Sequence, residues 1–222
     1  MQIDFEKKEI QLKLVYYGPA LSGKTTNLIY IHRHAAPSSK GHLMTLETKD
    51  DRTLFFDLLP MHFETEFGLT ITVKLFTVPG QVIHNATRRL VLQGADAVAF
   101  IADSQVSETD ANRDSFLDLK ENLQENGLDI KGMPLVIQFN KRDLPNIRPS
   151  HEIKQMAQKG REPVYEAVAT TGEGVLETLL GLVELTWERL NAWHNLEDKF
   201  QVDGASLLNN LKRQLSPPEA GR

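Results

Sequence analysis

The 222-residue chain contains no cysteine and no long run of apolar residues. Disulfides and thiolate metal sites are therefore excluded, and so are prenyl and palmitoyl anchors, because these need cysteine. No apolar stretch approaches the length of a membrane-spanning helix, and the start at Met1-Gln2 has neither a secretory signal pattern nor a myristoylation glycine. We therefore expect a cytoplasmic protein without a lipid anchor or transmembrane segment.

Basic charge is also in deficit. The chain has 25 Lys and Arg residues against 30 Asp and Glu residues, a net charge of −5, and no basic run stands out. This balance argues against a nucleic acid as a partner. Hydrophobic residues make up 41% of the chain, which is enough for one complete core. We expect a single α/β domain with an appendage.

The most informative motif present is G-x-x-x-x-G-K-[ST], which spans Gly18 to Thr25 and directly follows the apolar run 12–17. Gly18 and Gly23 let backbone N–H groups approach a phosphate without an intervening Cβ. Lys24 would reach the β and γ phosphates, and the Thr25 hydroxyl would ligate Mg²⁺. The motif predicts a site for a nucleotide triphosphate at the start of a helix over 24–34. The expected phosphate contacts come from Gly18, Leu21, Ser22, Gly23, Lys24, Thr25 and Thr26.

A second motif indicates which base is bound. Asn140-Lys141-Arg142-Asp143 directly follows the apolar run 134–139. The Asp143 carboxylate can accept two hydrogen bonds from the N1–H and 2-amino groups of guanine, a pattern that adenine does not offer. Asn140 can tie this loop to the phosphate loop, and the Lys141 stem can lie over the purine. The predicted ligands are therefore GTP and GDP.

The order of the predicted elements indicates a largely parallel, doubly wound sheet. Strands are predicted at 12–17, 69–78, 97–102, 135–140 and 164–168, and helices at 24–34, 109–126, 151–159 and 174–195. Two extended runs on either side of Phe67-Gly68 predict a hairpin with one antiparallel edge strand. Pro60 lies in the first run, and an edge strand tolerates proline.

The C-terminal segment continues the helical apolar spacing beyond the expected end of the domain. The stripe includes Trp187, Trp193 and Phe200, and after Asp203-Gly204 leucines recur at helical spacing. We place the main domain at 1–195 and a helical or flexible extension at 196–222. The extension either docks on its own domain or binds a partner, and we expect it to be separable from nucleotide binding.

The chain resembles Ras-like small GTPases, and among these the bacterial MglA family of gliding-motility and cell-polarity GTPases. The segments that carry the resemblance are 15–19, 23–28, 51–57, 77–81 and 140–145. The resemblance implies a P-loop G domain that uses Mg²⁺, binds GTP as a molecular switch and hydrolyses it to GDP.

The resemblance also implies roles for individual residues. Thr53 resembles the first-switch threonine that reaches Mg²⁺ and the γ phosphate, and Arg52 resembles an arginine finger carried in the same chain. Gln81 resembles the second-switch glutamine that orients the attacking water. Ala169 would donate its backbone N–H to guanine O6. The contacts implied beyond the two motifs come from Thr53, Gly80, Ala169 and Thr170.

Two positions depart from the usual Ras-like pattern. Thr77 stands where most Ras-like proteins have the Asp of D-x-x-G, as it does in the MglA family, so a carboxylate near the metal is missing unless Asp57 or Asp51 replaces it. Ala20 stands where glycine is usual, and its Cβ would crowd the transition state and slow hydrolysis. These departures motivate an alternative, a pseudo-GTPase that serves as a nucleotide-bound scaffold. The guanine-type motif disfavours a kinase or ATPase.

The resemblance further implies partners and a setting. These are an activating protein of the roadblock fold (MglB-like), unidentified effectors, and recruitment of the protein to a cell pole or membrane through them. A role in cell polarity or gliding motility is implied on the same basis.

Overall fold

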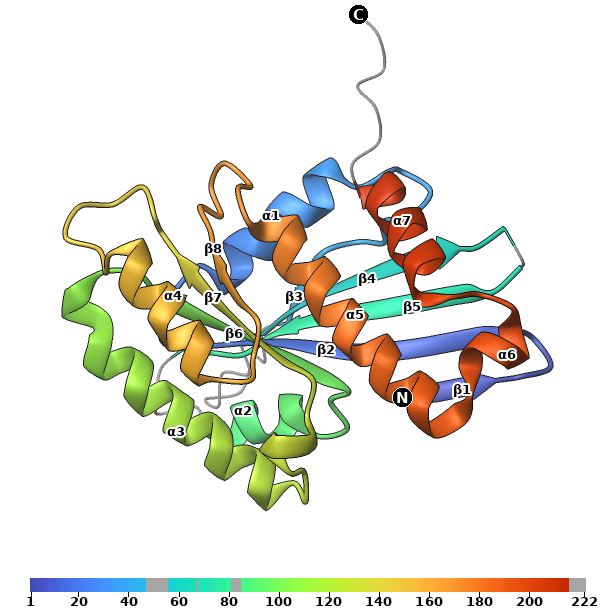
Figure 1. Ribbon diagram of the computed structural model, residues 1–222, viewed down its shortest axis with the longest axis horizontal. Helices are drawn as coiled ribbons and strands as arrows, with labels where there is room; N and C mark the ends of the chain where they lie inside the picture. The colour runs from blue at the N-terminus through green and yellow to red at the C-terminus, as the bar shows by residue number, and fades with distance from the viewer. Residues whose placement is uncertain (47–55, 67, 81–84, 216–222) are drawn as a thin grey trace, which may run out of the picture.

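The computed structural model describes residues 1–46, 56–66, 68–80 and 85–215. These residues form an eight-stranded sheet with helices on both faces (Figure 1). The strands are β1 Gln2–Asp4, β2 Glu9–Tyr17, β3 Met44–Leu46, β4 Phe56–Glu64, β5 Thr70–Thr77, β6 Ala97–Asp103, β7 Leu135–Asn140 and β8 Val164–Glu166. The helices are α1 Lys24–His34, α2 Asn85–Leu92, α3 Thr109–Glu125, α4 Ser150–Lys159, α5 Val175–His194, α6 Leu196–Phe200 and α7 Gly204–Leu215.

The sheet has the order β3-β4-β5-β2-β6-β7-β8, and β1 pairs with the first half of β2. Strands β5, β2, β6, β7 and β8 run parallel, whereas β4 runs antiparallel to both β5 and β3. This confirms the predicted α/β class, the largely parallel sheet and the antiparallel hairpin strand β4. Strand β4 is not the edge, however, because β3 pairs outside it, and β1 is a second antiparallel strand, which pairs with β2. The short β3 pairs outside β4, and residues 39–41 continue along the same side, where the Gly41 N–H donates to the Pro60 backbone oxygen at 2.9 Å. Pro60 itself has no N–H to donate to this side.

Burial patterns explain which strands lie inside. Every residue of β6 is buried, as expected for a parallel strand that is covered on both faces. Along β4 and β5 buried residues alternate with less buried ones, because these strands turn only one face to the core. One core cluster packs β2 and β5 against α1, α5, α6 and α7, and a second packs the opposite face against α2, α3 and α4.

The C-terminal segment docks on its own domain. Six of its apolar side chains belong to the first core cluster, and all are at most 3% exposed: Leu196, Phe200, Val202, Leu207, Leu211 and Leu215. The backbone oxygen of Gln214 accepts a 2.8 Å hydrogen bond from the N–H of Ala36, just after α1. In Figure 1, α7 lies beside α5 on the face that also carries α1. The segment therefore has no separate core of its own.

Four of these elements were not expected from the sequence: the short helices α2 and α6 and the short strands β1 and β3. Trp187 is buried, as a core anchor should be, whereas Trp193 is 66% exposed and packs under the Arg189 guanidinium. No described helix has the length and apolar character needed to cross a membrane.

The arrangement fixes where a ligand can bind. The loops that follow β2, β5, β7 and β8 all leave the same edge of the sheet, because these strands run parallel. In open α/β sheets ligands bind at this carboxyl edge. Both nucleotide motifs of the sequence lie there.

Candidate functional site

The phosphate loop connects β2 to α1 and has the backbone that its glycines predict. Gly18 and Gly23 have φ angles of 143° and 97°, and a Cβ on Gly23 would overlap the Asn140 side chain. Gly23 caps α1 without a side-chain hydrogen bond, and the first turn of α1 contains no acidic residue. The N–H groups at the start of such a helix favour an anion.

Lys24 is the buried cation of this loop. It is only 6% exposed, and its Nζ donates to the backbone oxygens of Gly18 at 3.0 Å and Pro19 at 2.6 Å. Burial, together with the nearby Arg88, lowers the pKa of Lys24 to about 7, although Asp57 opposes the shift. The Lys24 amine lies between two backbone carbonyls. A bound phosphate would add the negative charge that stabilises its ammonium form.

Oxygen ligands from four elements meet beside Lys24. The Asp57 carboxylate on β4 accepts hydrogen bonds from Thr25 at 2.6 Å, Thr77 at 2.9 Å and Thr45 at 2.9 Å. The Asp57 N–H in turn donates to the Thr77 hydroxyl at 2.9 Å. Hydroxyl and carboxylate oxygens suit Mg²⁺, which typically takes one or two carboxylates and completes its shell with phosphate oxygens and water.

Asp57 is the candidate carboxylate that the structure describes beside Thr77. The sequence allowed Asp51 or Asp57 to replace the missing carboxylate, and the structure places Asp57 against both Thr25 and Thr77. Thr77 itself is the last residue of β5, as expected for a strand-end residue. Asp51 lies outside the described residues.

The base-reading loops are also brought to the phosphate loop. Asn140 donates from Nδ2 to the Ser22 backbone oxygen at 2.8 Å and accepts at Oδ1 from the Ala169 N–H at 2.9 Å. The expected tie between the two loops is therefore present, and the Ala169 N–H that was predicted for guanine O6 has Asn140 as its partner here. The Lys141 Nζ is 2.6 Å from the Asp103 carboxylate, which fixes the lysine stem.

The remaining predicted residues fall into two groups. Asp143 and Thr170 are exposed at the rim, Leu21 is 88% exposed with a φ of 62°, and Ser22 is buried. Arg52, Thr53 and Gln81 lie outside the described residues.

A cavity of about 510 Å³ lies beside the phosphate loop. It is lined by phosphate-loop residues, Thr26, Thr45, Asp57 and the stretch from Thr77 to Gly80.

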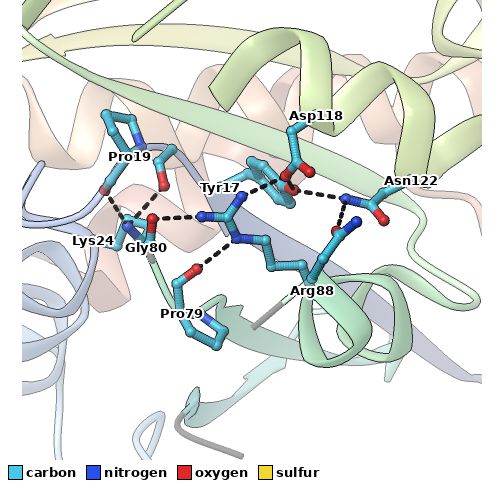
Figure 2. Close-up of polar contacts among 10 residues, drawn as sticks. Tyr17, Pro19, Lys24, Pro79, Gly80, Arg88, Asp118 and Asn122 are labelled. Atoms are coloured by element: carbon cyan, nitrogen blue, oxygen red, sulfur yellow. Dashed lines mark hydrogen bonds and ion pairs between the residues drawn. The ribbon is translucent and has the colours of Figure 1, made fainter. Parts of the chain in front are cut away.

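Sequence reasoning missed a buried polar group behind this cavity. Arg88 on α2 contacts the backbone of Pro79 and Gly80 and the carboxylate of Asp118 on α3 (Figure 2). Nothing in the sequence distinguishes Arg88 from the adjacent Arg89, because only the packing of α2 determines which arginine points inward.

A G-domain architecture with a P-loop, a metal-type oxygen cluster and a guanine-type loop defines the class of small GTPases. In a comparison with characterised proteins, the chain is 46% identical over 188 residues to the mutual gliding-motility protein MglA of Myxococcus xanthus, strain DK1622. The match covers 85% of this chain and 96% of that protein. The chain belongs to the MglA family of small GTPases. A search of protein-family models gave no match.

Proposed function

We propose that this protein is a molecular switch that binds GTP and hydrolyses it to GDP and phosphate. The observation that carries the proposal is the contact of Asp57 with Thr25 and Thr77 beside the phosphate loop. Asp57, on the neighbouring strand β4, thereby supplies a carboxylate next to Thr77, where the usual carboxylate is missing. The carboxylate and hydroxyl oxygens together suit a nucleotide with its metal. The contact supports binding of a nucleotide with its metal, and the measurement of turnover separates the switch from a nucleotide-bound scaffold.

The residues divide the work as follows. Lys24 and the N-terminal N–H groups of α1 bind the β and γ phosphate oxygens, and Asp57 orients the Thr25 hydroxyl. Mg²⁺, when bound, would neutralise charge on the β and γ oxygens. Gln81 orients a water for attack on the γ phosphorus, and Arg52 stabilises the charge that develops as the bond to the β-phosphate oxygen breaks. Thr53 and Gly80 complete the contacts to the γ phosphate.

Guanine selection is assigned to the base-reading loops. Asp143 accepts from the N1–H and 2-amino groups of guanine, and the Lys141 stem lies along the purine. Ala169 and Thr170 form the opposite rim. Asn140 couples this rim to the phosphate loop through its bond to the Ser22 backbone.

The experiment that tests the proposal is single-turnover phosphate release from GTP by the purified chain, with and without an activating partner. Arg52→Ala and Gln81→Leu should each slow release by about 10³- to 10⁵-fold, or roughly 4–7 kcal/mol, with GTP affinity close to that of the parent. Arg113→Ala is the matched control, because that side chain is 62% exposed on α3. Ala20→Gly should speed release, because it removes a methyl group beside the reacting phosphate.

The outcomes separate the two candidate functions. Tight GTP binding without turnover, even with an activator, would support the scaffold instead. Equal rates for Arg52→Ala and the parent would remove the in-chain arginine finger from the mechanism.

We also propose a role in cell polarity or gliding motility for this chain. It rests on the family, because the relative from Myxococcus xanthus is named as a gliding-motility protein. The accompanying partners are a roadblock-fold activator and effectors that prefer the GTP state, with the protein in the cytoplasm until they recruit it to a pole or membrane. A pull-down that compares GTP-analogue and GDP states should yield state-specific partners.

A further inference from the structure

Arg88 is an unusual residue because it is a charged side chain that is almost completely buried. Only 1% of it is exposed, and arginines are seldom buried unless every donor has a partner. Here Nε donates to the Pro79 backbone oxygen at 2.9 Å, Nη2 to the Gly80 backbone oxygen, and Nη1 to Asp118 at 2.5 Å. The planar guanidinium of Arg88 thus connects Pro79 and Gly80, which follow β5, with helix α3.

Gly80 is held from its other side by the phosphate loop. A Cβ on Gly80 would overlap the backbone of Ala20, so only glycine fits this contact. The Val78 N–H, two residues earlier, donates to the Tyr16 backbone oxygen at 3.2 Å and continues the pairing of β5 with β2. Pro79 and Gly80 are therefore clamped between the phosphate loop and the guanidinium.

The carboxylate that orients Arg88 is itself part of a buried network. Asp118 also accepts from the hydroxyl of Tyr17, the residue directly before the phosphate loop. Asn122, one turn further along α3, donates to that hydroxyl at 3.1 Å and to Asn85 Oδ1 at 2.7 Å. Figure 2 shows Asp118 between the Arg88 guanidinium and the Tyr17 hydroxyl, with Asn122 on the far side of that hydroxyl. Such networks restrict the geometry of the groups that they join. The Asn122 Oδ1 has no hydrogen-bond partner among the described residues.

We propose that Arg88 is a positioning residue that fixes the point from which the second switch begins. Gln81 directly follows Gly80, and α2, which carries Arg88, begins at Asn85. By holding the Gly80 carbonyl, Arg88 fixes one end of the segment that contains Gln81. A misplacement of about 1 Å at such a point can cost about 10²-fold in rate. The inference rests on the proposed GTPase function for its kinetic part and on the fold alone for its structural part.

The test compares Arg88→Met with Arg89→Met on the same helix. Arg89 is 50% exposed in a surface ion pair with Glu125, so its loss should leave rate and binding within about twofold of the parent. In the nucleotide-free protein, Arg88→Met should speed hydrogen exchange of the Val78 amide, which donates to Tyr16, by about tenfold. It should also lower single-turnover hydrolysis by about 10- to 100-fold while GTP affinity stays within about threefold.

Arg88→Lys keeps the proposal testable if Arg88→Met does not fold. A lysine retains the charge, but a single ammonium cannot serve the two carbonyls and the carboxylate together, so its effects should have the same direction and be smaller. Exchange and hydrolysis equal to those of Arg89→Met in both variants would overturn the proposal. So would a loss of GTP affinity that equals the loss of rate, because that pattern marks a purely structural role. A parent that binds no GTP would refute the proposed function, while the exchange measurement would still decide on Arg88.

Discussion

Lys24 should take up a proton when the nucleotide binds. Its amine lies between two backbone carbonyls of its own loop and is 6% exposed. Burial and, to a smaller extent, the nearby Arg88 lower the pKa of Lys24 from 10.5 to about 7. Above pH 7 the free protein therefore holds mostly a neutral amine, and a bound triphosphate would restore the ammonium form.

The size of the effect follows from the shift. A pKa that falls from 10.5 to about 7 corresponds to roughly 5 kcal/mol by which the free site disfavours the ammonium. At pH 8.5 binding should take up nearly one proton, and between pH 7 and about 10 affinity should fall by about tenfold per pH unit. In the same window the unfolded chain binds more protons than the native one, so the free energy of unfolding should rise with pH.

Titration calorimetry at pH 8.5 in two buffers of different ionisation enthalpy measures this uptake directly. The phosphates are fully ionised there and contribute no protons of their own. Lys13→Met is the matched control, because burial also lowers the pKa of Lys13 but that side chain bonds to Gln93 rather than to the phosphate loop. The uptake should persist in this variant. Equal binding enthalpies for the parent in both buffers would refute the reasoning.

Three further predictions concern the metal cluster, the base and the C-terminus. Asp57→Asn should raise the Mg²⁺ concentration needed to retain GTP, because Thr25 loses a hydrogen bond to a charged partner worth about 1.5–3 kcal/mol. Release of a fluorescent nucleotide measures this, and an unchanged Mg²⁺ dependence would contradict a role of Asp57 at the metal. Asp143→Asn should weaken GTP and favour xanthosine triphosphate in competition binding, whereas ATP that binds the parent as tightly as GTP would contradict the assignment of the base loop. Truncation after Asn195 should lower the melting temperature strongly, because it removes six buried apolar side chains worth about 1.5–3 kcal/mol each; a truncated chain that melts like the parent would show that the segment is separable, as first expected.

Much of the architecture was predictable because its signals are local. Strand β7 and helix α1 begin and end where the sequence predicted, since apolar runs and a glycine-rich loop border them. The two nucleotide motifs were readable because each requires particular residue types at a fixed spacing. Helices α2 and α6 were missed because they are short and have no clear start signal.

The roles of Asp57 and Arg88 were not readable in this way. Asp57 reaches Thr25 because β4 pairs antiparallel with β5 in a register that sets Leu58 opposite Phe76, and hence Asp57 beside Thr77. A slip of one residue would turn Asp57 to the other face of the sheet. The sequence also left open whether the C-terminal stripe meets its own domain or a partner, because amphipathic spacing does not identify the opposing surface.

The sequence by itself determined the class of this protein, the phosphate and base loops, and the edge of the sheet where they meet. These properties depend on residue types and on spacings within one element. Only the tertiary structure decided that Asp57 contacts Thr25 and Thr77, which of two adjacent arginines is buried, and where the C-terminal helices dock. Those outcomes depend on strand register and on how helices pack across the sheet, which bring together residues that are far apart in the chain.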